Sequence, residues 1–277
     1  MSKANIFVVG GAGYVGSHTV KELSKMGYNP VVLDNFSTGH RSFCKWGEKI
    51  EVDIMDKNTL EQAFSKYKPS AVLHFAAHAY VGESVTNPKK YYSNNVVGTL
   101  NLLDVMLASG TKKIIFSSSC AVYGVPNVVP ITEGEKKDPI NPYGFTKLVI
   151  ERALQDYGVA YDFRSVCLRY FNAAGADPEG EIGETHDPET HLIPLVLEVA
   201  AGTRDKVTVF GNDYPTDDGT CIRDYIHVSD LATAHVAALK HLEANKESLS
   251  INLGTGRGYS VKEVLDSAQR VTGRKIH

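Results

Sequence analysis

Two side chains near the middle of the chain could perform acid–base chemistry together. Tyr143 and Lys147 lie four residues apart. Asn141 can cap a helix that begins at Pro142, which places Tyr143 in the first turn and Lys147 one turn later on the same face. The helix N-terminus and the ammonium both favour phenolate, although a free tyrosine has a pKa of about 10. The pair therefore predicts a tyrosine that removes a hydroxyl proton as hydride leaves carbon.

A serine cluster upstream could bind the same substrate oxygen. Ser117, Ser118 and Ser119 end a run that reads as a strand, and doubly wound sheets bind ligands at the carboxyl ends of their strands. We expect Ser119 to hydrogen-bond the substrate. Ser117 and Ser118 are expected to satisfy the backbone of a turn.

A glycine pattern at the start of the chain predicts a dinucleotide site. Gly10, Gly13 and Gly16 follow a strand pattern and open a helical one, the context in which helix amides hold a pyrophosphate. Asp34 ends the second expected strand, where a carboxylate accepts hydrogen bonds from a ribose and repels a 2′-phosphate. The alternative interpretation is that these glycines form only a tight strand-to-helix turn and that Asp34 is an ordinary solvated strand end without a ligand. In combination with Tyr143, the pattern predicts NAD-dependent hydride chemistry on an alcohol or ketone.

The elements that must position these residues alternate between strand and helix patterns. That alternation predicts an α/β fold, a doubly wound, Rossmann-like parallel sheet with helices on both faces. Expected strands lie at 6–9, 30–33, 71–75, 113–116 and 163–168, and expected helices at 13–26, 58–67, 88–108 and 142–157.

The composition changes after Phe171. Residues 172–188 are rich in Gly, Pro, Asp and Glu, which is typical of a connection or lid. We predict a dinucleotide-binding domain over 1–171 and a smaller C-terminal α/β substrate-binding domain over 172–277. Helical patterns in the second part cover 192–201, 229–242 and 260–271, the last starting with a capping box at Ser260 and Glu263.

Charge and composition exclude several partners. The net charge of -3 and the lack of like-charge blocks argue against nucleic acid. Four widely spaced cysteines fit a reducing cytoplasm. The start Met1 to Asn5 leaves no room for a signal peptide, and no apolar run reaches bilayer length, so no membrane partner is expected. His74 and His78 straddle a strand end, so we expect packing or cofactor-loop roles and no metal site.

Several motifs resemble the extended short-chain dehydrogenase/reductase family. They are the runs 9–18, 33–35, 81–84, 91–96, 117–119, 169–172 and 211–227. The earlier runs are shared by many nucleotide-sugar enzymes, whereas 211–227 is similar to the enzymes that epimerise UDP-hexoses at C4. The resemblance implies NAD as cofactor and interconversion of UDP-galactose and UDP-glucose through a 4-keto intermediate.

The resemblance also implies roles for individual residues. Tyr143 would be the base, Lys147 its activator and ribose anchor, and Ser119 a partner of the sugar O4. Cofactor contacts would come from Gly10, Gly13, Tyr14, Val15, Gly16, Asp34, Asn35, Phe36, Ser37, Thr38, Gly39, Asp53, Ile54, Phe75, Ala76, Ala77, Ala79, Asn94, Ser119, Tyr143, Lys147 and Phe171. Substrate contacts would come from Ser119, Tyr143, Asn172, His191, Leu192, Thr208, Val209, Phe210 and Arg223.

Family members usually continue beyond His277, so the substrate-binding domain is expected to be incomplete at its carboxyl end. His191 and Ala79 stand where some members have asparagine and lysine. Resemblance implies a homodimer formed through the helices at 88–108 and 142–157.

Two other functions remain open from the sequence. A nucleotide-sugar 4,6-dehydratase begins with the same oxidation, but it needs an acid and a base where this chain has Cys120 and Ala121. A non-catalytic NAD sensor would keep the fold, but it has no use for the Tyr143 and Lys147 pair.

Overall fold

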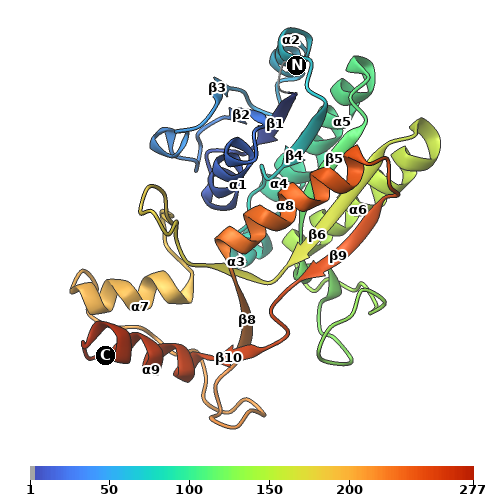
Figure 1. Cartoon of the computed structure of the whole chain (residues 1–277). Coiled ribbons are helices and arrows are strands. Elements are labelled where there is room, and N and C mark those ends of the chain that lie inside the picture. Colours follow the sequence, from blue (N-terminus) through green and yellow to red (C-terminus); the bar gives the residue numbers. More distant parts are fainter. Residues whose placement is uncertain (1–3) are drawn as a thin grey trace.

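The computed structural model describes residues 4–277, built around a seven-stranded parallel sheet. The strand order is β3-β2-β1-β4-β5-β6-β9 (Figure 1). The order reverses between β1 and β4, and ligands of such sheets bind at that switch point, outside the carboxyl ends of the strands. The strands are β1 (Asn5–Val9), β2 (Asn29–Asp34), β3 (Glu48–Glu51), β4 (Ala71–His74), β5 (Lys113–Ser119), β6 (Arg164–Tyr170) and β9 (Leu249–Leu253).

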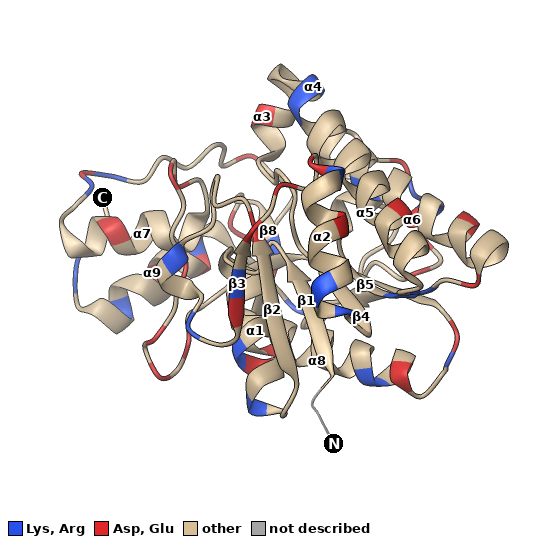
Figure 2. Ribbon diagram, turned by 90° about the horizontal axis from the view of Figure 1, so that it is seen from above, with Lys and Arg blue, Asp and Glu red and all other residues tan. Residues whose placement is uncertain are grey.

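Helices cover both faces of this sheet, as Figure 2 shows from above. One layer holds α2 (Lys57–Tyr67), α5 (Gly98–Ser109) and α6 (Pro142–Tyr161), and the other holds α1 (Tyr14–Lys25) and α8 (Val228–Glu243). Alternation along β1 explains the two layers, because Phe7 and Val9 belong to one buried cluster and Ile6 and Val8 to the other. The predicted fold class is confirmed.

A second, smaller sheet lies at the other end of the molecule (Figure 1). Its order is β10-β8-β7, with β7 parallel and β10 antiparallel to β8. The strands are β7 (Asn172–Ala174), β8 (Ile222–His227) and β10 (Gly258–Ser260), accompanied by α7 (Leu192–Ala201) and α9 (Val261–Thr272). The capping box that the sequence predicts at Ser260 and Glu263 is confirmed.

The chain returns to the large sheet after the predicted boundary. Strand β9 pairs with β6, and α8 packs against α1. The division into 1–171 and 172–277 stays a prediction. Helix α8 and strand β9 belong to the second part by sequence, but they pack against α1 and pair with β6 of the first part. The sequence patterns did not predict β3, β7, β9 or β10, because these strands are short or only partly buried. The region of β8 was noted only as part of a motif, without a strand being predicted there.

The helix expected at 88–108 is interrupted by a π-helical turn. It consists of α4 (Pro88–Tyr91), the turn η2 (Tyr92–Val97) and α5, and it follows α3 (Val81–Thr86). Such turns inside α-helices are frequent at functional sites. Two short 3₁₀ helices, η1 (Arg41–Phe43) and η3 (Cys120–Tyr123), complete the elements.

Within residues 4–277, no helix has both the length and the apolar character that crossing a bilayer requires. Met1 to Lys3, on which part of the signal-peptide argument falls, lie outside the described residues.

Candidate active site

The turn between β1 and α1 contains two glycines, Gly10 and Gly16, that cannot be replaced without strain. A Cβ on Gly10 would lie 2.4 Å from the amide nitrogen of Ala76, and one on Gly16 would lie 2.3 Å from the carbonyl oxygen of Gly10. Around Gly13 there is space, with the nearest atom 3.5 Å from a Cβ. No side chain caps the N-terminus of α1. This close backbone turn and uncapped helix end fit a bound pyrophosphate.

Asp34, at the carboxyl end of β2, braces the same turn. Its Oδ2 accepts a hydrogen bond from the Ala12 amide at 2.9 Å, and its Oδ1 accepts one from the Phe36 amide at 2.8 Å. Burial raises the pKa of the Asp34 carboxyl, and the two amides partly oppose the shift. The carboxylate also lines the cleft beside the turn, where its remaining lone pairs can accept ribose hydroxyls.

Most of the predicted cofactor residues line one cleft along the carboxyl edge of the sheet. They are Gly10, Gly13, Tyr14, Val15, Gly16, Asp34, Asn35, Ser37, Thr38, Gly39, Ile54, Phe75, Ala76, Ala77, Ala79 and Asn94. The same cleft is also lined by His78, for which we expect a packing or cofactor-loop role, and by Tyr80, Lys90, Tyr170 and His186, to which sequence reasoning gave no role. Tyr170 belongs to the motif run 169–172, whereas Tyr80, Lys90 and His186 carry no motif, and their place at the cleft follows from tertiary packing.

The other predicted cofactor residues lie outside the lining of this cleft. Asp53 holds the side chain of Asn35, since its Oδ2 accepts a hydrogen bond from Asn35 Nδ2 at 2.9 Å. The Phe36 ring lies 3.9 Å from the guanidinium of Arg41. Phe171 contacts the position at which a Cβ on Gly254 would stand. Ser119, Tyr143 and Lys147 form a separate group on β5 and α6.

The helix carrying Tyr143 and Lys147 begins as the sequence predicts. The Asn141 side chain accepts a hydrogen bond from the Gly144 amide at 2.8 Å, with Pro142 as the first helical residue. Lys147 is buried, its Nζ donating to the Ser117 carbonyl at 2.8 Å and lying 5.7 Å from the centre of the Tyr143 ring. The prediction that the two side chains share one face is confirmed.

The prediction that this arrangement lowers the pKa of Tyr143 is wrong for the protein alone. Burial raises the pKa of Tyr143, Tyr170 adds to the shift, and a hydrogen bond with Ser119 opposes it. Burial also lowers the pKa of Lys147 to about 7, against an opposing effect of Glu151. The sequence argument counted the charges but omitted desolvation, which is the largest contribution at both residues.

The three serines of β5 have separate roles. Ser119 ends the strand, and its Oγ accepts a hydrogen bond from the Ala121 amide at 3.2 Å. Ser117 Oγ lies 2.5 Å from the Tyr170 hydroxyl, and Ser118 Oγ donates to Glu151 at 2.6 Å. The expectation that Ser117 and Ser118 satisfy turn backbone is wrong, since both bond to side chains. Ser117 thereby connects Lys147 to a tyrosine of the cofactor cleft.

A buried ion pair lies one helical turn beyond Lys147. Arg169 on β6 binds Glu151 through two hydrogen bonds, 2.8 Å from Nε to Oε1 and 2.5 Å from Nη2 to Oε2. Both side chains are 2% exposed. The third arm of Arg169 donates to the Tyr123 hydroxyl at 2.8 Å. Glu151 lies on α6 itself, and its spacing of four from Lys147 is the only signal for it in the sequence.

Asn95, in the π-helical turn, ties the cofactor cleft to α6. Its Nδ2 donates to the His78 carbonyl at 3.0 Å and to Thr146 Oγ1 at 3.2 Å, and its Oδ1 accepts from the His78 amide at 2.9 Å. Asn95 is fully buried. The turn therefore fixes the loop after β4 against the helix of Tyr143.

The predicted substrate residues of the C-terminal part line a second cavity. They are Asn172, His191, Leu192, Thr208, Val209, Phe210 and Arg223. Arg204 and Lys206, which the sequence analysis did not single out, bring two more cations to this wall. Asn172 is held by its own side chain, which donates to the Asp224 carbonyl at 2.9 Å. His191 lines both cavities, so they lie next to each other.

Comparison with known proteins identifies a family and close relatives. A model described as the NAD dependent epimerase/dehydratase family matches residues 6–254. The UDP-glucose 4-epimerase of Rhizobium meliloti is 56% identical over 277 residues, covering 100% of this chain and 84% of the relative. The UDP-glucose 4-epimerase of Halalkalibacterium halodurans is 52% identical, covering 98% of this chain and 81% of the relative.

Solved structures that are similar to this chain are also UDP-glucose 4-epimerases. The UDP-glucose 4-epimerase of Brucella ovis, in complex with NAD, superposes with a TM-score of 0.97 at 59% identity and covers 99% of this chain and 84% of its own. The enzyme of Bifidobacterium longum, in complex with NAD+ and UDP, gives a TM-score of 0.94 at 42% identity, with 99% and 84% covered.

The Glu151 and Arg169 pair generates a stability prediction. Replacing Arg169 with Met strands a buried carboxylate, so we expect a loss of about 3–5 kcal/mol in the free energy of unfolding. The double variant Glu151→Met/Arg169→Met removes both charges of this pair, and the loss should be smaller than in Arg169→Met. Urea denaturation of the three proteins measures the difference. A double variant that is less stable than Arg169→Met would contradict this account.

Lys147 generates a pH prediction. Its pKa is about 7 in the folded protein against an ordinary value of 10.5, so between these pH values the unfolded chain binds more protons and stability rises with pH. The variant Lys147→Met lacks this group. We expect the wild type to gain stability relative to Lys147→Met as the pH rises from 7 to 9.5, in urea melts of protein freed of dinucleotide. A difference that does not change over this range would refute the buried, deprotonating lysine.

Proposed function

This chain belongs to the NAD-dependent epimerase/dehydratase family, and we propose that it catalyses the UDP-glucose 4-epimerase reaction, interconverting UDP-galactose and UDP-glucose with NAD as cofactor. The observation that carries the proposal is 56% identity over 277 residues with a relative of that name. The cleft at the glycine turn and the cation-lined cavity beside it supply places for the dinucleotide and the UDP-sugar.

We propose that Tyr143 takes the proton from the sugar O4 and returns it at the end of the reaction, with Ser119 bonded to the same oxygen. NAD, when bound, supplies the hydride acceptor and, in its oxidised form, a positively charged ring. A cation near Tyr143 favours its phenolate and opposes the rise in pKa that burial causes. Lys147 adds to this effect in its protonated form and can hold the nicotinamide ribose.

The second cavity is proposed to hold the UDP group. Arg204, Lys206 and Arg223 line it, and guanidinium and ammonium groups bind diphosphate oxygens strongly. Firm retention of UDP keeps the 4-keto sugar from leaving, while looser contacts to the hexose allow it to turn and receive hydride on its other face. Net oxidation is zero.

We further propose that the protein works in the reducing cytoplasm. All four cysteines, Cys44, Cys120, Cys167 and Cys221, are free. Unpaired thiols fit that compartment better than an oxidising one.

We propose a homodimer whose interface is formed by two helices of each subunit. One is the interrupted helix made of α4, η2 and α5, and the other is α6. Tyr92, Val97, Leu100 and Phe145 are each 38–46% exposed on these elements. Large apolar side chains gathered on one surface are typical of an interface between subunits.

Sedimentation tests the dimer. We expect the wild type to sediment at twice its chain mass at micromolar concentration, and Leu100→Arg to sediment as a monomer because a charge in an apolar interface is costly. The matched control is Val125→Arg, which changes an apolar residue that is 76% exposed on a loop elsewhere. A monomeric wild type would overturn the proposal.

The assignment of the base is tested by Tyr143→Phe. Loss of a general base should lower kcat by about 10²- to 10⁴-fold, with NAD binding retained. Conversion of UDP-galactose to UDP-glucose gives the rate, and fluorescence of bound NADH gives cofactor binding. Tyr161→Phe on the same helix is the control and should keep full activity.

An unchanged rate in Tyr143→Phe that still binds NAD would contradict the role of this residue. A wild type that makes a 6-deoxy-4-keto product instead would replace the epimerase assignment by a dehydratase.

A further inference from the structure

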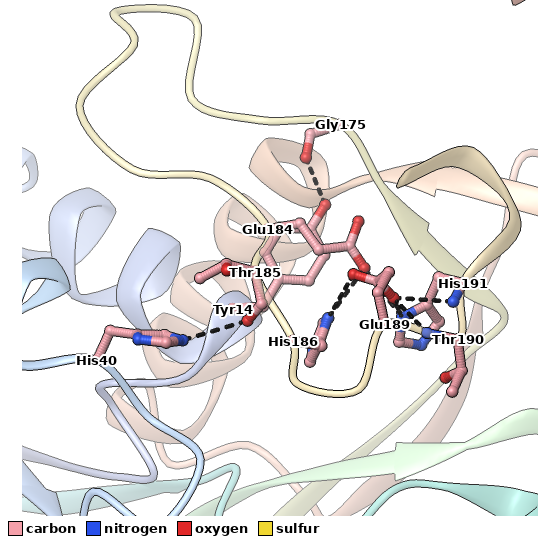
Figure 3. A network of polar contacts seen from close by, with 9 residues as sticks. All are labelled: Tyr14, His40, Gly175, Glu184, Thr185, His186, Glu189, Thr190 and His191. Carbon is pink, nitrogen blue, oxygen red and sulfur yellow. Dashed lines mark hydrogen bonds and ion pairs between the residues drawn. The ribbon is translucent and has the colours of Figure 1, made fainter. Parts of the chain in front are cut away.

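Four potential metal ligands come together in the loop between β7 and α7. Glu184, His186, Glu189 and His191 lie within eight consecutive residues, and one ligand atom of each lies within 4.8 Å of the others. Figure 3 shows the four side chains pointing toward one another beside Tyr14. Sequence reasoning did not find this cluster, because the spacing matches no metal motif considered there.

Four separations within the cluster are close to the spacing of ligands around a metal ion, with the two oxygens of Glu189 facing different histidines. His186 Nδ1 lies 3.4 Å from Glu184 Oε1 and 3.3 Å from Glu189 Oε2. His191 Nδ1 lies 3.1 Å from Glu184 Oε1 and 2.9 Å from Glu189 Oε1. Ligands bound to zinc at about 2.0–2.1 Å in tetrahedral geometry stand about 3.3 Å apart.

Hydrogen bonds account for Glu189 Oε1, which accepts from the backbone amides of Thr190 and His191 at 2.8 Å each, but not for the other contacts of the cluster. Each Nδ1 carries at most one proton, yet each faces two carboxylates, and the separations from His186 exceed the usual limit of about 3.2 Å. The Glu184 side chain is 9% exposed. Among residues 4–277, no donor outside the cluster hydrogen-bonds its carboxylate. A buried carboxylate needs a compensating positive charge.

We propose that Glu184, His186, Glu189 and His191 bind one divalent metal ion, with zinc as the best match. Two carboxylates balance its charge, and the imidazoles bind in their neutral form. Two nitrogen and two oxygen donors suit zinc, whereas calcium and magnesium prefer oxygen ligands alone.

A neighbouring acidic group of the same loop does not offer such a site. Asp177, Glu179 and Glu181 surround the ammonium of Lys21, which lies 2.7, 2.6 and 2.7 Å from their oxygens. The lysine already supplies the cation there. This group therefore provides control positions on the same loop.

The ion would brace the loop that borders both cavities. His186 and His191 line the dinucleotide cleft, and His191 also lines the second cavity. Two further hydrogen bonds attach the loop to α1 and to the segment after β2. The Tyr14 hydroxyl donates to the Gly175 carbonyl at 2.5 Å, and His40 Nε2 lies 3.3 Å from the Thr185 carbonyl (Figure 3). The role is structural, and it does not depend on the proposed reaction.

Metal binding by the full chain tests the site directly. Protein stripped with a chelator should bind one equivalent of Zn²⁺, and Co²⁺ should give the intense visible absorption of tetrahedral coordination. The variants Glu184→Gln and Glu189→Gln should each weaken Zn²⁺ binding by at least about tenfold. Glu179→Gln, on the same loop and 57% exposed, should bind as the wild type does.

Far-UV circular dichroism and NAD binding establish that each variant is folded. Two glutamate variants are made so that the test can still be completed if one of them does not fold. The proposal is overturned if the stripped wild type takes up no stoichiometric Zn²⁺ or Co²⁺, or if both glutamate variants bind as tightly as Glu179→Gln does. A stripped chain that takes up no Zn²⁺ or Co²⁺ but still epimerises UDP-sugars would remove the ion site and leave the proposed function intact.

Discussion

One buried ammonium group, that of Lys147, lies beside Tyr143 at the centre of the candidate site. Lys147 is 3% exposed and held by the Ser117 carbonyl. A buried ammonium is tolerated only with compensation, and Glu151, itself fixed by Arg169, supplies the nearest negative charge. Desolvation therefore leaves the lysine poised to lose its proton near neutral pH, where a small change in its surroundings alters its charge.

Placement of the site follows from the sheet. The strand order reverses between β1 and β4, and the glycine turn, Asp34 and the loop after β4 all meet at that edge. Asn95 in the π-helical turn then links this edge to the catalytic helix. The dinucleotide cleft and the Tyr143 helix are thus joined by buried hydrogen bonds, which hold reacting groups in fixed geometry better than surface contacts do.

The loop between β7 and α7 connects the two cavities. It is held by Lys21, which pairs with three carboxylates, by Tyr14, and by the Glu184 to His191 cluster. One residue, His191, faces both cavities. The loop therefore borders both cavities and is fixed to α1 by ion pairs, of which Lys21 with Asp177 is buried.

The sequence by itself determined the features that depend on near neighbours: the α/β alternation, the glycine turn, the Asn141 cap and the shared face of Tyr143 and Lys147. It determined most of the cleft residues only through family motifs. The tertiary structure decided the pKa of Tyr143, the pairing of Glu151 with Arg169 and the return of β9 to the large sheet. These depend on burial and on contacts between distant segments, and no local pattern of residues specifies either.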